Sequence, residues 1–175
     1  MKTGFAILFI CTVLMFSLVA SVSNADAHRS LPNSQHIPNN CKSVDELPDS
    51  KCTPGSIDPK VTQANIKNTI CKSGYTKTVR PPVSYTEPLK IKLTKSYGIK
   101  DSLKNYELDH LIPLEIGGNP TDVKNLWPEP HSSSSTKDGL ENYLHDQVCS
   151  GNMKLEDAQK AIATNWYDYW MRVKN

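Results

Sequence analysis

Three side chains in one short segment have the types and spacing that cleavage of a phosphodiester bond would use. Asp109 and His110 are adjacent at the end of an apolar stretch, and Asn125 follows after a Gly-Gly turn. A neutral imidazole accepts a proton from water, a carboxylate holds a divalent cation, and an amide orients the imidazole. Histidine suits the first task because its unperturbed pKa lies near neutrality. The segment therefore predicts a hydrolytic site.

Two short strands and a turn are expected to position these groups. Residues 107–114 and 123–127 are rich in apolar side chains, and the Gly-Gly-Asn-Pro sequence 117–120 between them is typical of a turn. Adjacent residues of a regular strand point to opposite faces, so Asp109 and His110 converge only if the strand twists or ends there. The proline and the two glycines that follow favour such an end.

The order strand, turn, strand and helix, with Asp-His on the first strand and Asn at the second, resembles the ββα-metal core of HNH endonucleases. The resemblance covers residues 106–141 and implies that His110 is the general base, Asp109 a metal ligand and Asn125 the amide that holds the imidazole. It also implies a divalent metal ion as cofactor, Mg²⁺ in the first place, with Mn²⁺ or Zn²⁺ as alternatives.

The helix that follows departs from the family at the last metal ligand. Lys137 is in register with a lysine of the family, but Ser134 occupies the position where HNH endonucleases place a ligand. His131, the nearest histidine, and Asp138, whose oxygens suit Mg²⁺, are the expected replacements, and Glu141 offers a further carboxylate. The alternatives are an exposed loop position for His131 and a helix-start charge, favoured by the helix dipole, for Asp138.

Further short motifs extend the resemblance to a set of small exported bacterial proteins that carry this HNH-like core. That wider resemblance implies a fold more than an activity. Its motifs are Cys52-Thr53-Pro54-Gly55, Thr69-Ile70-Cys71, Val79-Arg80-Pro81, the block 107–128, Lys137-Asp138 with Glu141, Val148-Cys149, Ala158-Gln159 and Asn165-Trp166.

The N-terminal segment predicts export. Residues 1–27 combine an early lysine, an apolar run and a small-x-small sequence, as a signal peptide does; a membrane anchor is the alternative. The apolar run is short for a membrane span, so no stable membrane insertion is expected after cleavage. Residues 28–50 are rich in Ser, Asn and Pro and are expected to form a flexible lead. Residues 51–175 then form a single domain, with the core motif at 106–149.

Cysteine usage agrees with an oxidising compartment, either outside the cell or in the periplasm. Apart from Cys11 in the signal segment, the chain contains Cys41, Cys52, Cys71 and Cys149. No Cys-x-x-Cys spacing is present, so disulfides are expected rather than a zinc site. Three pairings are open, and in each of them one bridge ties Cys149 to the N-terminal half.

Helices are expected to dominate the domain. This predicts an α+β class, in which a mainly helical domain surrounds a small antiparallel hairpin followed by a helix and is stabilised by disulfides. Apolar residues at helical spacing predict helices over 61–71, 86–98, 137–149 and 155–173. Alternating Thr and bulky residues predict a short strand over 75–79, closed by two prolines.

The net charge of +2, from 20 basic and 18 acidic residues, is too small to indicate nucleic-acid binding by itself. The distribution is more informative, because residues 72–104 carry eight Lys or Arg and two acids. This segment is expected either to follow a phosphate backbone or to form a solvated helix face. Arg80 and Lys137 are the expected phosphate contacts, with little base preference.

Together these features predict a secreted or periplasmic, metal-dependent endonuclease that hydrolyses DNA, with RNA as a second substrate. Two alternatives stay open. One is a nucleic-acid-binding module on the same scaffold that has lost its last metal ligand, which the serine run 132–135 favours. The other is a metal-dependent phosphodiesterase that acts on a small molecule. Whether a protein partner such as an inhibitor exists is left open.

Overall fold

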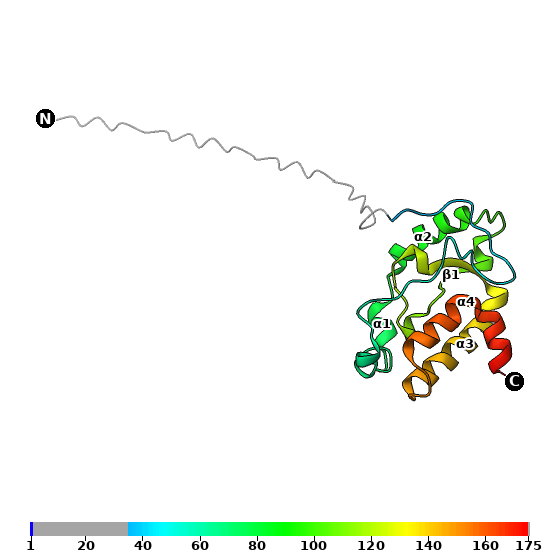
Figure 1. The fold of residues 1–175 in the computed structure, drawn as a ribbon. Helices are drawn as coiled ribbons and strands as arrows, with labels where there is room; N and C mark the ends of the chain where they lie inside the picture. Colours follow the sequence, from blue (N-terminus) through cyan, green and yellow to red (C-terminus); the bar gives the residue numbers. More distant parts are fainter. Residues whose placement is uncertain (2–34, 175) are drawn as a thin grey trace. The chain divides into compact units, whose positions relative to one another are not determined.

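In the computed structural model the chain divides into two units, Met1–Ser30 and Leu31–Asn175. The structure describes Met1 and residues 35–174, which are coloured along the chain in Figure 1; residues 35–174 belong to the second unit. The expected signal peptide 1–27 and the first part of the expected lead lie outside the described residues, apart from Met1. No helix within residues 35–174 is both long and apolar enough to span a membrane.

A two-stranded antiparallel hairpin carries the residues singled out from the sequence. Its strands are β1 (Tyr106–His110) and β2 (Leu126–Pro130), and the register pairs Asp109 with Trp127 and His110 with Leu126. The predicted hairpin is therefore confirmed, with a shorter first strand and a later second strand than the sequence indicated. The α+β class is confirmed with it.

One face of the hairpin packs against α2 (Val83–Ser96). Leu126 of β2 forms an apolar cluster with Leu89 and Leu93 of this helix, and these three side chains are almost fully buried. Figure 1 shows α2 on the opposite side of β1 from α3 and α4. Because neighbouring residues alternate between faces, His110, which is paired with Leu126, belongs to the α2 face.

The other face packs against α3 (His131–Cys149) and α4 (Leu155–Val173). Trp127 is fully buried in the larger apolar cluster, to which these two helices contribute seven of the sixteen buried side chains within residues 35–174. Asp109, which is paired with Trp127, belongs to this α3 face. The alternation expected for a regular strand is therefore present at Asp109 and His110, and it directs their side chains to opposite faces of the hairpin.

The segment 75–79 is a helix, α1 (Tyr75–Val79), so the strand predicted there is wrong. A strand needs a partner for its backbone groups, and within the described residues β1 and β2 pair only with each other. Gly74 starts the helix with a φ of 80°. Arg80 ends it in an extended conformation, as the residue before a proline prefers.

The remaining helix predictions differ from the structure mainly at their starts. The helix α3 begins at His131, so the serine run is its first turn, whereas residue 137 was the predicted start. The helix α2 begins at Val83 after Pro82, ahead of the predicted start at residue 86. The segment predicted over 61–71 is a 3-10 helix, Gln63–Asn68, and α4 has the predicted bounds.

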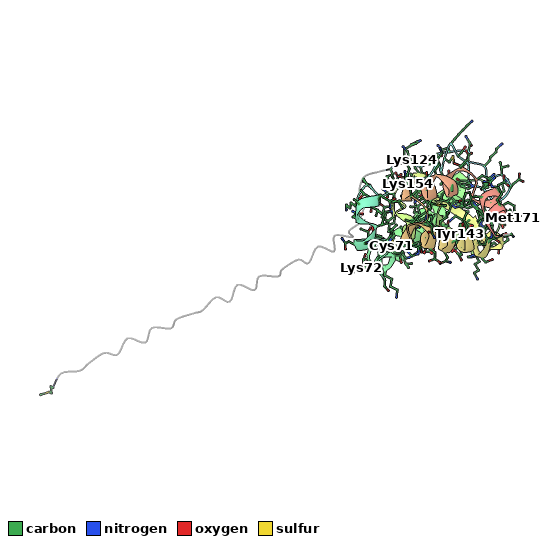
Figure 2. All side chains as sticks on the ribbon, turned by 60° about the horizontal axis from the view of Figure 1, so that its bottom comes forward. Cys71, Lys72, Lys124, Tyr143, Lys154 and Met171 are labelled. Carbon is green, nitrogen blue, oxygen red and sulfur yellow. A yellow bond between two sulfur atoms is a disulfide. The ribbon has the colours of Figure 1, made fainter. Side chains whose placement is uncertain are left out.

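Two disulfides hold the domain, as the cysteine count predicted. They join Cys41 to Cys52 and Cys71 to Cys149, of which Cys71 is labelled in Figure 2. The second bridge has a sequence separation of 78 and connects the C-terminus of α3 to the turn before α1. In the chain-entropy description, a closed loop of this length contributes roughly 4–5 kcal/mol to the free energy of unfolding.

Candidate active site at the end of the hairpin

A small pocket opens where β1 ends, with a volume of about 90 Å³. Charged and titratable side chains from several parts of the chain dominate its lining. They are Arg80 from the end of α1, Asp109 and His110 from β1, Glu115 from the following 3-10 helix, and Glu141 from α3, together with Thr76, Pro113 and Leu114.

His110 is buried, with 6 % of its surface exposed, and its ring is held by one hydrogen bond. Nε2 lies 3.1 Å from the carbonyl oxygen of Pro120. A carbonyl oxygen only accepts, so Nε2 carries a proton and Nδ1 of the neutral ring keeps the free lone pair. Burial lowers the pKa of His110, although the Asp109 carboxylate acts in the opposite direction. The ring is therefore neutral near pH 7 and able to accept a proton at Nδ1.

Asn125 does not hold the imidazole directly, which corrects its predicted role. Its fully buried amide accepts from the backbone N–H of Ile112 at 2.9 Å and donates to the carbonyl oxygens of Ile112 at 2.9 Å and Asn119 at 3.0 Å. These bonds fix both ends of the loop that leads from β1 to Pro120. Asn125 therefore orients His110 indirectly, by fixing the loop whose Pro120 carbonyl binds the ring.

The Gly-Gly pair makes this loop geometry accessible. Gly117 has a φ of 78°, in the left-handed region that favours glycine. A Cβ atom on Gly118 would lie 1.7 Å from the carbonyl oxygen of Ile112, so the loop leaves no space for a side chain there. The backbone of Gly118 takes part in the turn, because its N–H donates to the carbonyl oxygen of Pro113 at 2.9 Å.

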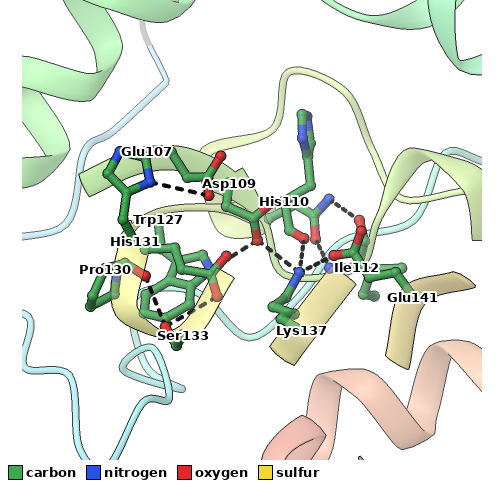
Figure 3. Close-up of polar contacts among 12 residues, drawn as sticks. Glu107, Asp109, His110, Ile112, Trp127, Pro130, His131, Ser133, Lys137 and Glu141 are labelled. Carbon is green, nitrogen blue, oxygen red and sulfur yellow. Dashed lines mark hydrogen bonds and ion pairs between the residues drawn. The ribbon is translucent and has the colours of Figure 1, made fainter. Parts of the chain in front are cut away.

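The Asp109 carboxylate points away from the imidazole of the adjacent His110, as Figure 3 shows. Its Oδ2 atom lies 2.7 Å from the ammonium of Lys137 and accepts a longer bond, 3.4 Å, from Nε1 of Trp127. Burial alone would raise the pKa of Asp109, but the nearby ammonium holds it below its usual value. The side chain retains 20 % exposure where it borders the pocket.

Lys137 is fully buried, and this corrects its predicted contact with a phosphate. Its ammonium donates to Asp109, to Oε1 of Glu141 and, at 3.0 Å, to the carbonyl oxygen of His110. Although burial alone would lower the pKa of Lys137, the surrounding carboxylates raise it. An ammonium enclosed in this way cannot reach a nucleic acid outside the protein.

Glu129 completes this group of charges, and sequence reasoning missed it. It lies on β2 with 2 % exposure, it is hydrogen-bonded to Asp109, and the hydroxyl of Ser133 donates to its Oε1 at 3.4 Å. Burial raises the pKa of Glu129 to about 9, and the Asp109 carboxylate adds to the shift. No sequence pattern marked Glu129, whereas the i, i+4 spacing of Lys137 and Glu141 was a readable signal.

The three metal ligands expected from the resemblance are not brought together. His131 has 53 % side-chain exposure and its Nδ1 lies 3.6 Å from Glu107, while Asp138 is exposed on α3. Ser134, at the family's ligand position, donates to the carbonyl oxygen of His131. Within residues 35–174, no group of three or more His, Cys, Asp or Glu side chains is arranged to hold a metal ion. The residues present do not fit the metal site that the resemblance implies.

Two groups of the pocket remain available to a ligand. Arg80 is exposed, and its positive charge is close enough to lower the pKa of His110 further. Glu115 is partly buried, burial raises its pKa, and its Oε1 atom is buried with no hydrogen-bond partner. The pocket thus combines a neutral base, a cation and an acid with an unsatisfied oxygen.

Comparisons with known proteins give no relative: no protein-family model, no curated protein and no solved structure matches the chain.

Proposed function

We propose that the protein hydrolyses phosphodiester bonds of nucleic acid, DNA and also RNA, in the pocket at the end of β1. The observation that carries the proposal is that His110, Arg80 and Glu115 line one pocket of about 90 Å³. The pocket is small and lined mainly by charged groups, which suits a phosphate group better than a base. The contacts therefore concern the backbone, and no sequence preference is expected.

Each of the three groups has a role in the displacement at phosphorus. His110 accepts a proton at Nδ1 from the water molecule that attacks the phosphorus. Arg80 binds the phosphate oxygens through its planar guanidinium. Glu115, whose pKa is raised by burial, gives a proton to the leaving oxygen. One P–O bond forms and one breaks, and each of the two protons has a donor and an acceptor.

The resemblance to HNH endonucleases would add a divalent metal ion that stabilises charge on the phosphate. Because the expected ligands do not fit such an ion, none of the steps above is assigned to it. We also infer that the protein works outside the cytoplasm, since structural disulfides persist in oxidising compartments.

A non-catalytic nucleic-acid-binding module is the second candidate. One observation favours it: the Asp109 carboxylate, which the resemblance assigns to the metal, is already paired with Lys137 at 2.7 Å. A scaffold with this pairing could retain Arg80 and the basic segment for phosphate binding after losing hydrolysis. Binding without cleavage distinguishes this candidate from the enzyme.

The test is incubation of the purified protein with supercoiled plasmid, single-stranded RNA and a chromogenic small diester. Each substrate is tested with EDTA, Mg²⁺, Mn²⁺ and Zn²⁺. We expect nicking of plasmid that His110→Ala reduces by roughly 10²–10⁴-fold. The matched control is His36→Ala, which removes an exposed histidine outside the pocket.

Plasmid binding without nicking under all conditions would replace the enzyme by the binding module. Cleavage of the small diester alone would indicate a phosphodiesterase for small molecules. Nicking that is equal in both histidine variants would assign the activity to a contaminant and contradict the proposal.

A further inference from the structure

The ammonium of Lys137 has a complete set of partners. Nζ carries three N–H donors, and it has three oxygen partners: Asp109 Oδ2 at 2.7 Å, the carbonyl oxygen of His110 at 3.0 Å, and Glu141 Oε1. Figure 3 shows these contacts converging on one nitrogen from β1 and α3. No donor is left over for water or for a ligand.

A third carboxyl group adjoins this set from β2. Glu129 is hydrogen-bonded to Asp109 and is as deeply buried as Lys137 itself. Carboxyl groups from β1 and α3 and one backbone carbonyl therefore contact the buried positive charge directly, and Glu129 of β2 adds a third carboxyl group through Asp109. Hard oxygen donors of this kind are the ligands that Mg²⁺ and Mn²⁺ prefer in proteins.

We propose that Lys137 is the resident cation of this cluster, with its ammonium occupying the place where the HNH resemblance implies a divalent metal ion. A lysine ammonium is a compact point charge, so it fills a cation position between oxygens. A divalent ion on the same Asp109 carboxylate would lie within a few ångströms of Nζ and would be repelled by it. The native protein consequently binds no divalent ion at Asp109.

The same geometry predicts that a variant without the lysine can bind a divalent cation. Removal of the lysine side chain leaves the three oxygen partners of Nζ, from Asp109, Glu141 and the His110 carbonyl, around a vacated volume inside the protein. The Asp109 carboxylate and the other two oxygen donors then lack a cation. Lys137→Ala is therefore expected to gain a site for Mg²⁺ or Mn²⁺.

The inference is independent of hydrolysis, because it concerns cation binding. Only its consequence for activity, which is that nicking should persist in EDTA, rests on the proposed function. If the native protein cleaves no substrate, the proposed function is contradicted, but the inference about cation binding stands. If the native protein binds a divalent cation at Asp109, the inference is contradicted, but the proposed function stands.

The experiment compares the native protein, Lys137→Ala and the control Lys124→Ala by thermal unfolding and calorimetric titration. Each is measured in EDTA and in millimolar MgCl₂ or MnCl₂. The expected result is no metal response in the native protein or in Lys124→Ala, whose mutated residue is exposed. Lys137→Ala should have a lower Tm in EDTA, an increase in Tm with the cation, and one cation bound per chain.

Two results would overturn the inference. One is a folded Lys137→Ala that binds no cation. The other is Mn²⁺ binding by the native protein that Asp109→Asn abolishes, since the metal would then share the cluster with the lysine. If Lys137→Ala does not fold in either buffer, Mn²⁺ titration of the native protein and of Asp109→Asn decides the question, with absence of binding supporting the inference.

Discussion

The two faces of the hairpin place the adjacent residues Asp109 and His110 in different environments. On the α3 face, Asp109 lies in a closed group in which Lys137 and Glu129 are buried and each has partners. At the pocket, His110 keeps a free lone pair, Arg80 is exposed, and an oxygen of Glu115 has no partner. The contrast teaches that the densest cluster of charges holds the fold together, whereas the less satisfied groups beside it are the ones available for chemistry.

The largest expected effect on stability comes from a change in the buried group of Asp109, Lys137, Glu129 and Glu141. Lys137→Met keeps the volume but leaves Asp109 and Glu141 without their cation, which should lower the free energy of unfolding by about 3–5 kcal/mol. Urea denaturation measures the change, with Lys124→Met as the exposed control. A loss below about 1 kcal/mol would mean that the buried carboxylates do not depend on the lysine.

Removal of the Asn125 amide should affect both the stability of the fold and the orientation of His110 in the pocket. Asn125→Ala leaves buried backbone groups of Ile112 and Asn119 without partners, at a cost of about 2–3 kcal/mol in stability. Because the loop also carries the Pro120 carbonyl, the orientation of His110 should be lost with it. NMR titration of the His110 ring reports this directly, since a pKa unchanged from the native protein would show that the loop is held by other contacts.

The pH dependence of stability should separate the two sides further. Glu129 has a folded-state pKa of about 9 against an ordinary value of 4.5, so the folded state binds more protons between these values. Its stabilising contribution is complete below about pH 4.5 and is lost as the pH rises through about 9. Glu129→Gln stays neutral, so its stability should decline less than that of the native protein over this range.

Denaturant unfolding at a series of pH values measures that difference. The control is Glu156→Gln, which replaces an exposed glutamate at the start of α4. Parallel curves for native protein and Glu129→Gln would show that Glu129 is ionised in the folded state.

The smallest effect on stability is expected at the pocket, where Arg80 is exposed. Arg80→Ala removes an exposed cation, so the free energy of unfolding should change by less than about 0.5 kcal/mol. Affinity for nucleic acid should fall more strongly at low salt than at high salt, because a phosphate contact is lost. Fluorescence anisotropy with a labelled oligonucleotide checks this, with Lys77→Ala on α1 as the control. Equal effects of both variants would indicate a diffuse basic surface instead of a contact at the pocket.

The sequence was most informative where a local pattern of residues is enough to determine a helix, a strand or a turn. Two short apolar segments and the Gly-Gly turn between them predicted the hairpin, and the apolar stripe over 155–173 predicted α4 with its bounds. The cysteine count predicted two bridges but could not select between pairings, because pairing depends on the spatial distance between cysteines far apart along the chain.

The predictions that failed depend on tertiary contacts. Alternation over 75–79 resembles a strand, yet among residues 35–174 no strand pairs with it, and the segment forms α1. Lys137 was predicted to contact a phosphate, but it is buried, because carboxyl groups from both strands and from its own helix lie around its ammonium. Asn125 was assigned to the ring, whereas its hydrogen-bond partners are backbone groups of a loop.

The Cys71–Cys149 bridge also sets an order of events during synthesis. Cys149 leaves the ribosome only after both strands and most of α3 have been made, whereas Cys41 and Cys52 emerge early and close together. In an oxidising compartment that the chain enters from its N-terminus, the short bridge can therefore form first, but the long one must wait until both strands and α3 have arrived. Covalent closure around the pocket is thus a late step of maturation, and oxidation of Cys71 with an earlier cysteine would trap the chain before it is finished.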